Sequence, residues 1–237
     1  MTWSIVAHDP ETGAFAVTVA TCNFAVGASC PFIRAGVGAV STQSMTNRYL
    51  GPAILDGMAR GLAPAAAIEG ALTGDAGAGL RQVHAVDIHG RTAAWTGQNC
   101  VEWCGSQDTP FISVAGNMLA GPTVIAATLD AMKRQGPLPE RMMAAMHAGQ
   151  AAGGDKRGRQ SAAMLLVTTE DFADLDIRVD DHAEPFLELD RLLTIWRRDA
   201  APGLATRPRK ADPAGDIDFD AIEGRWKAKG LDLRLRR

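Results

Sequence analysis

Small residues dominate this chain and restrict how its layers can pack. Of its 237 residues, 66 are Ala or Gly, whereas only 13 are Phe, Trp or Tyr. Because Ala, Val and Leu side chains fill little space, the sheets and helices around such a core must approach one another closely. The hydrophobic fraction of 46% and the charged fraction of 22% are ordinary for a soluble globular protein. The composition therefore predicts closely stacked layers and argues against a disordered chain.

Strand and helix patterns follow one another in groups along the first two thirds of the chain. Alternating apolar residues on either side of the turn at 9–13 predict a hairpin. Further strands are expected at 36–43, 82–88, 92–96, 112–115 and 162–168. Helices are expected at 51–62, from Pro64 to Leu72, from Pro122 to Met132 and from Pro137 to about Gly149. This order predicts an α+β fold in which two helical layers cover two sheets.

The last part of the chain is far more charged than the first. Residues 1–150 hold 18 charged side chains, whereas residues 151–237 hold 33. We therefore expect a domain at 1–183 and a charged helical extension at 184–237. Helical spacing of apolar residues at 186–196 predicts a helix, and this face is also the candidate for self-association into a homo-oligomer. A second short helix is expected within 217–233.

Several classes of protein are disfavoured by charge and composition. The net charge of -3 provides no positive field for nucleic acid, and no run of 18 apolar residues predicts a membrane span. The N-terminal residues do not resemble a signal peptide, so a cytoplasmic protein is expected. The four cysteines lack zinc-site spacing and are interpreted as small buried side chains, and residues 216–227 depart from a calcium loop. We expect no metal and no cofactor.

The segment at 151–162 is the richest in chemical groups. Gly154 allows a close backbone approach, Asp155 stands among three cations, Arg159 can pair with a carboxylate and Ser161 supplies a hydroxyl. A ligand-binding loop and a turn that braces the entry to a strand are both open interpretations. Asn117, at the end of an expected strand, can likewise hold a developing oxyanion or cap a turn.

Thr2 is a candidate nucleophile. If Met1 is removed, residue 2 carries both a hydroxyl and a free α-amine, and an amine with a pKa near ~8 can act as the base for that hydroxyl. The small side chain of residue 2 favours this removal. Retention of Met1 would abolish the mechanism, and Ser4 would be a weaker substitute.

Several segments together resemble a known bacterial family. They are Trp3-Ser-Ile-Val-Ala at 3–7 with Asp-Pro-x-Thr-Gly at 9–13, Ala-Val-Gly at 25–27, Ala-Gly-Val-Gly-Ala-Val at 35–40, Thr-Gln at 42–43, Thr-Gly at 96–97 with Cys100, Gly-Asn at 116–117, and Ala-Gly-Gly-Asp-x-Arg-Gly-Arg-Gln-Ser-Ala at 152–162. In this order they resemble the domain of unknown function 1028, over residues 2–183. That family is grouped with the N-terminal nucleophile hydrolases, which cleave amide bonds.

The resemblance implies a four-layer α-β-β-α sandwich with Thr2 as the nucleophile. The catalytic set would then be Thr2, Asn117 and Asp155. We assign Gln43, Gly154, Arg159 and Ser161 to binding of a small amide or peptide-like substrate. Because the activity is carried over from a superfamily, a non-catalytic protein that uses the same fold for ligand binding or assembly is the alternative.

Overall fold

The computed structural model describes residues 2–236, so Met1, on which the Thr2 hypothesis depends, lies outside the described residues. The chain forms two compact units that divide between Thr194 and Ile195. No helix among the described residues is long and apolar enough to cross a bilayer. The predicted division at 183/184 stays a prediction.

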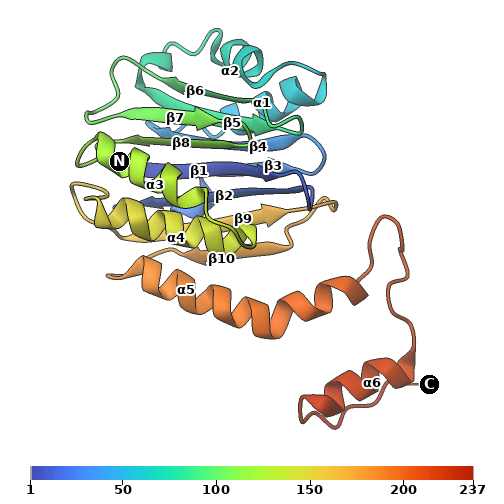
Figure 1. Ribbon diagram of the computed structural model, residues 1–237. Coiled ribbons are helices and arrows are strands. Elements are labelled where there is room, and N and C mark those ends of the chain that lie inside the picture. Colours follow the sequence, from blue (N-terminus) through green and yellow to red (C-terminus); the bar gives the residue numbers. More distant parts are fainter. Residues whose placement is uncertain (1, 237) are drawn as a thin grey trace. The chain divides into compact units, whose positions relative to one another are not determined.

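The first unit contains two antiparallel sheets (Figure 1). The six-stranded sheet has the order β10 (Leu175–Val179), β9 (Ser161–Val167), β2 (Ala14–Thr21), β1 (Thr2–Asp9), β8 (Ile112–Asn117) and β7 (Gly105–Thr109). The four-stranded sheet has the order β3 (Pro31–Arg34), β4 (Gly38–Ser44), β5 (Arg81–Asp87) and β6 (Thr92–Thr96). The two sheets face each other, and β1 of the larger sheet lies against β4 and β5 of the smaller one.

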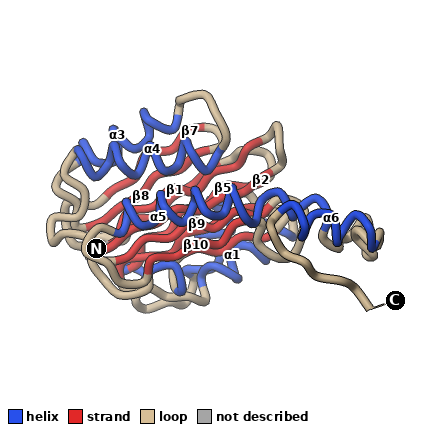
Figure 2. Tube along the Cα trace, turned by 90° about the horizontal axis from the view of Figure 1, so that it is seen from below, coloured by secondary structure: helices blue, strands red, loops and turns tan. Residues whose placement is uncertain are grey.

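Helices cover the outer face of each sheet (Figure 2). On the four-stranded sheet, α1 (Leu50–Ala59) and α2 (Pro64–Leu72) bury an apolar core that includes Val40, Ile54, Ile68 and Val83. On the six-stranded sheet lie α3 (Pro122–Met132) and α4 (Leu138–Ala151). A proline occupies the first turn of α2, α3 and α4, where its missing N–H is tolerated and its fixed φ favours the helix.

Helix α5 (Pro185–Ile195) completes the first unit. Its Phe186 ring packs 5.7 Å from the Trp3 ring of β1, centroid to centroid. Phe186, Leu189 and Leu193 are buried within the chain itself. This apolar face is therefore not available to a second subunit in this structure, and the homo-oligomer stays a prediction.

The layer between the sheets has two chemically different halves. One half, which we call the apolar half, consists of Val6, Phe15, Val17, Ala39 and Val86. The other, which we call the polar half, consists of Thr2, Ser4, Gln43, Gln82, His84, Ser113 and Asn117, all of them buried. Both halves follow from strand alternation, because every second residue of β1, β4, β5 and β8 faces the opposite sheet.

The structure confirms the expected strands and helices and adds three strands. The added strands are β3, β7 and β10, and each is the outermost strand at an edge of its sheet. The α+β class with two antiparallel sheets and helices is thereby confirmed.

The second unit is mostly helical and polar. A π-helical turn at Trp196–Ala200 and a 3-10 helix at Ala201–Thr206 precede α6 (Phe219–Ala228). The Asp218 carboxylate caps α6 by accepting from the backbone N–H groups of Asp220 and Ala221. The helix expected within 217–233 is confirmed.

Candidate functional site

The polar half ends at the start of β1, a central strand of the six-stranded sheet. There Thr2 lies opposite Thr21 of β2 on one side and Asn117 of β8 on the other. The Thr2 side chain is buried, and its Oγ1 donates a hydrogen bond to Thr21 Oγ1 over 3.3 Å. The candidate nucleophile is thus held between the ends of two neighbouring strands rather than on a free loop.

Gln43 joins the two sheets beside Thr2. Its Oε1 accepts from Ser4 Oγ over 2.7 Å. Its Nε2 donates to Gln82 Oε1 over 2.9 Å, to the Ala115 carbonyl over 3.2 Å and to the Thr2 carbonyl over 3.4 Å. Because all three partners of Nε2 are acceptors, the orientation of this amide is fixed.

Gln82 fixes the side chain of Asn117 in turn. The Gln82 Nε2 donates to the Gly116 carbonyl over 2.8 Å and to Thr96 Oγ1 over 3.0 Å, so its Oε1 faces Asn117. Asn117 Nδ2 donates to that Oε1 over 2.9 Å. The remaining atom, Asn117 Oδ1, is buried and accepts no hydrogen bond from the described residues. A buried acceptor without a hydrogen bond costs about 1–3 kcal/mol of stability, so we expect a donor at this position.

His84 lies deeper in the polar half. Its Nε2 is 2.7 Å from Ser4 Oγ and its Nδ1 is 2.9 Å from Ser113 Oγ. Since the Ser4 hydroxyl already donates to Gln43, the His84 Nε2–H donates to Ser4 and Nδ1 accepts from Ser113. Burial lowers the pKa of His84 to about 3, so the imidazole stays neutral at pH 7.

This hydrogen-bond direction decides what Ser4 can do. A histidine that acts as a base has to accept the proton of the serine hydroxyl. Here His84 donates to Ser4, and both side chains are fully buried. The pair is therefore part of the bonding between the sheets and not a nucleophile with its base.

Asp155 lies in a tight turn next to the end of β2. Its Oδ2 accepts from the Cys22 backbone N–H over 3.1 Å, and its Oδ1 accepts from the Arg157 backbone N–H over 2.7 Å. Its backbone forms an isolated bridge with Leu119, two residues after Asn117. Asp155 thereby braces both strand ends that flank Thr2, through its side chain beside β2 and through its backbone beside β8.

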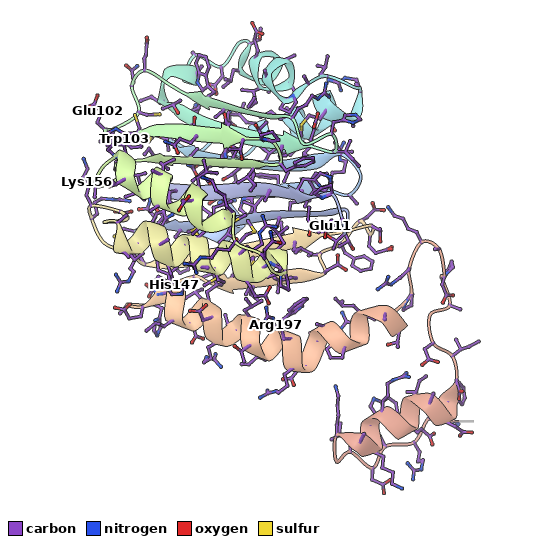
Figure 3. All side chains as sticks on the ribbon, in the orientation of Figure 1. Glu11, Glu102, Trp103, His147, Lys156 and Arg197 are labelled. Atoms are coloured by element: carbon purple, nitrogen blue, oxygen red, sulfur yellow. The ribbon has the colours of Figure 1, made fainter. Side chains whose placement is uncertain are left out.

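The turn also closes over the loop that follows β6. Lys156 Nζ donates to the Glu102 carbonyl, and Figure 3 shows Lys156 on the same side of the molecule as Glu102 and Trp103. Glu11, in the turn between β1 and β2, lies toward the opposite end of the strands. The two loops thus meet at one end of the sheets.

The other predicted residues of the turn have intramolecular partners. Arg159 forms a bidentate ion pair with Glu184, and Arg159 Nε lies 3.1 Å from Glu184 Oε2. Ser161 Oγ donates to the Asn23 carbonyl over 2.6 Å and accepts from the Val26 N–H over 3.1 Å. These contacts favour the bracing interpretation of the segment.

Gly154 meets a steric requirement of the turn. Its φ is +53°, and a Cβ at this position would come within 2.8 Å of the Gln150 side chain. The glycine is therefore explained by backbone conformation and close packing.

Comparison with known proteins identifies the family of this chain. The model for the family of unknown function DUF1028 matches residues 2–189. The chain belongs to this family. A crystal structure of a DUF1028 protein from Silicibacter pomeroyi is similar, with 28% sequence identity, a TM-score of 0.84, and coverage of 92% of this chain and 99% of that one.

More distant similarity is found to two Anbu structures. Anbu (ancestral β-subunit) from Yersinia bercovieri shares 12% identity with a TM-score of 0.36, covering 83% of this chain and 97% of that one. A mutant Anbu from Hyphomicrobium sp. strain MC1 shares 13% identity with a TM-score of 0.39, covering 86% and 98%. No curated protein matches the chain.

In this DUF1028 protein, the predicted residues fall into two groups. Thr2, Gln43 and Asn117 meet at one end of the polar half, whereas Arg159 and Ser161 contact other parts of the chain. Sequence reasoning missed Gln82 and His84, which fix the amide orientations. Two polar residues at alternate positions of β5 were the available signal, since Gln82 and His84 share one strand face. Among the described residues, no cluster of His, Cys, Asp or Glu could hold a metal ion.

Proposed function

We propose that this DUF1028 protein is an amidohydrolase of the N-terminal nucleophile type that acts on a small amide or peptide-like substrate. The observation that carries the proposal is the position of Thr2. It is the first residue of a central strand, and its hydroxyl lies among buried polar side chains from both sheets. Cleavage of the bond before Thr2 would place an α-amine on the same residue as this hydroxyl.

The architecture supports the same proposal at a coarser level. Two antiparallel sheets face each other, and helix pairs lie on their outer faces. We interpret this as the four-layer α-β-β-α sandwich of the N-terminal nucleophile hydrolases. Function still has to be argued from the site, because one fold hosts many activities.

The chemistry begins with the Thr2 hydroxyl. The α-amine, with a pKa near ~8, takes the hydroxyl proton while Oγ1 forms a bond to the substrate carbonyl carbon. The amine then returns the proton to the leaving nitrogen as the C–N bond breaks, which leaves an ester on Thr2. Water hydrolyses this ester by the same route and regenerates the hydroxyl.

Asn117 is suited to orient that base. Asn117 occupies the strand position opposite Thr2, and its Oδ1 has no hydrogen-bond partner within residues 2–236. An amine N–H that donates to this oxygen would satisfy the buried acceptor and leave the nitrogen lone pair for the hydroxyl.

The other roles expected from the sequence stay predictions. They are Asn117 as an oxyanion donor, Asp155 in catalysis, and Gln43, Gly154, Arg159 and Ser161 in substrate binding. The cytoplasmic location and the homo-oligomer also stay predictions.

The alternative is a protein that keeps this fold without turnover and uses it for ligand binding or assembly. One observation favours it, namely that both Asp155 oxygens and the Arg159 guanidinium are engaged within the chain. Under this alternative the polar half serves to hold the sheets together.

Substitution at Thr2 separates the two functions. On a panel of small amides, Thr2→Ala should abolish hydrolysis and Thr2→Ser should retain part of it, since serine keeps the hydroxyl. Both variants should unfold at nearly the wild-type temperature, because the wild-type hydroxyl makes one side-chain hydrogen bond of 3.3 Å, to Thr21. Hydrolysis that survives in Thr2→Ala, or a wild-type protein that turns over none of the panel, would favour the alternative.

A further inference from the structure

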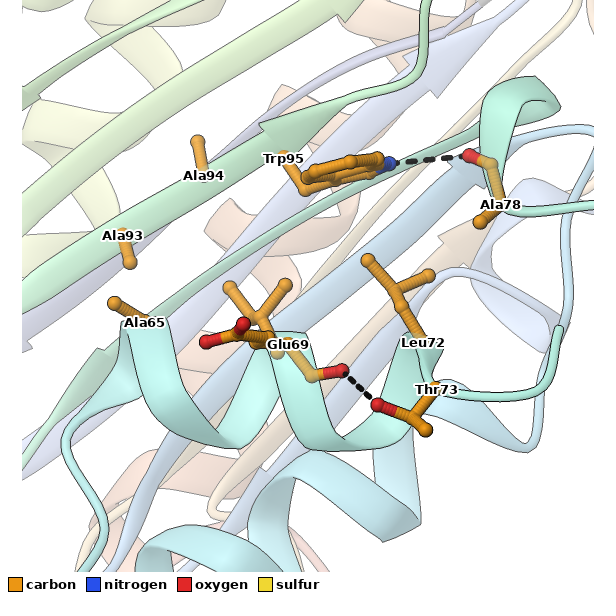
Figure 4. A pocket seen from close by; sticks show the side chains of 9 residues that line it. Ala65, Glu69, Leu72, Thr73, Ala78, Ala93, Ala94 and Trp95 are labelled. Atoms are coloured by element: carbon orange, nitrogen blue, oxygen red, sulfur yellow. Dashed lines mark hydrogen bonds between the residues drawn. The ribbon is translucent and has the colours of Figure 1, made fainter.

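A second candidate site lies on the outer face of the four-stranded sheet, away from the polar half. A cavity of about 500 Å³ opens between α2 and β6 (Figure 4). This volume lies within the range of small-molecule pockets, about 300–1,000 Å³. Its lining consists of Ala65, Ile68, Glu69, Leu72, Thr73, Ala78, Ala93, Ala94 and Trp95.

The wall of the cavity is apolar and has one rigid aromatic ring. Four alanines leave space, while Ile68 and Leu72 supply aliphatic surface. The Trp95 indole N–H donates to the Ala78 carbonyl over 3.1 Å, which fixes the ring. Trp95 is still 42% exposed, so a face of the ring remains available to a ligand.

Glu69 is the only charged residue of this lining. Within residues 2–236, its carboxylate forms neither an ion pair nor a side-chain hydrogen bond. Figure 4 shows Glu69 and Leu72 on α2 across the cavity from the Trp95 ring on β6. A negative charge and an indole ring therefore lie in opposite walls of the same apolar space.

We propose that this cavity binds a small organic cation, an ammonium group carried on a hydrocarbon body. The ammonium would be attracted both by the Glu69 carboxylate and by the electron-rich face of Trp95. The hydrocarbon body would displace water from the alanine, isoleucine and leucine surface. An anion is disfavoured by Glu69, and a neutral ligand gains only the apolar contacts.

The cavity is independent of the proposed hydrolysis. Trp95 pairs with Val83, whose side chain packs among the helices on the outer face, whereas Thr96 bonds to Gln82 in the polar half. Residues of the two sites thus alternate along one strand and face opposite sides of the sheet. Binding here is expected whether or not Thr2 is a nucleophile.

The test compares three probes of similar shape on the full chain by NMR of the tryptophan indole N–H groups. The probes are 2-phenylethylammonium, the neutral 2-phenylethanol and the anionic 3-phenylpropanoate. Trp95→Phe identifies the Trp95 signal by its disappearance. The proposal predicts a saturable shift of that signal with the ammonium probe, and binding of the alcohol at least about threefold more weakly.

Glu69→Gln is the decisive variant, because the residue is exposed and the change keeps its shape. It should remove the preference for the ammonium over the alcohol. Glu11→Gln, another exposed carboxylate, is the matched control and should leave that preference unchanged. The proposal is overturned if the Trp95 signal does not shift, if the alcohol binds as tightly as the ammonium, or if Glu69→Gln keeps the preference.

Discussion

The two halves of the layer between the sheets are built from the same strands but hold the sheets together differently. In the apolar half, Val6, Phe15 and Val17 of one sheet pack against Ala39 and Val86 of the other. In the polar half, a directed series of hydrogen bonds runs through buried side chains of both sheets. Buried contact area stabilises the apolar half and depends little on direction. In the polar half, every donor has to meet an acceptor.

The polar half contains one buried acceptor without a donor among the described residues, and this distinguishes it from a purely structural network. Every amide orientation in it is fixed, yet Asn117 Oδ1 accepts no hydrogen bond from the described residues. Buried polar atoms in proteins are nearly always partnered, and a catalytic role is one explanation for an exception. The comparison therefore assigns stability to the apolar half and both register and candidate chemistry to the polar half.

Removal of the largest side chain from the apolar half should have the greatest effect on stability. Phe15 is fully buried, so Phe15→Ala should lower the free energy of unfolding by about 3–5 kcal/mol through lost contacts and a cavity. Urea unfolding followed by circular dichroism measures this loss. A loss below about 1 kcal/mol would mean that the apolar half does not dominate stability.

Disruption of the polar half should cost somewhat less. In Gln82→Leu, leucine fills the space of the side chain with apolar atoms. The variant removes Gln82 Oε1, the acceptor that Gln43 Nε2 and Asn117 Nδ2 share. We expect a loss of about 2–4 kcal/mol in the same unfolding experiment, from two buried donors without that partner. A neutral or stabilising result would show that the network contributes nothing beyond filling space.

The buried imidazole of His84 should make stability depend on pH below its ordinary pKa of 6.5. The pKa of His84 is lowered from 6.5 to about 3 by burial, so below pH 6.5 the unfolded chain binds a proton that the folded chain does not. The contribution of His84 to stability is full above that pH and should fall by about 2 kcal/mol on going to pH 5. In His84→Gln, which is less stable throughout, this decrease should be absent. An equal decrease in both proteins would contradict the assignment.

The smallest effect is expected at the turn beside the site. The side chains of the Arg159–Glu184 pair are 30% and 47% exposed, so solvent screens their attraction. Glu184→Gln should change the free energy of unfolding by less than about 1 kcal/mol. A thermal melt with and without added salt checks this. A larger loss that salt does not reduce would show that the turn, and not the polar half, is the main brace of this end.

Most of the fold could be predicted from local pattern, and the part that could not has a physical reason. Apolar periodicity predicts the long buried strands and the helices that begin with a proline. The strands β3, β7 and β10 are short edge strands of four or five residues without the fully buried pattern of the central ones. Their pairing is determined by a neighbouring strand rather than by their own sequence.

Three residues of the candidate site could be singled out from the sequence, but their contacts could not. Thr2, Gln43 and Asn117 could be singled out from the sequence, and the structure brings them together. That Arg159 pairs with Glu184, and that Gln82 orients Asn117, depends on which strands become neighbours. Such contacts between distant parts of the chain leave no local signal.

We propose that Thr2 becomes an N-terminal nucleophile whose α-amine donates a hydrogen bond to Asn117 Oδ1. The mass of the intact purified protein tests it most directly, because the mechanism requires a free α-amine on residue 2. We expect a mass that corresponds to Thr2–Arg237. A mass that still includes Met1, in a protein that hydrolyses an amide, would contradict it.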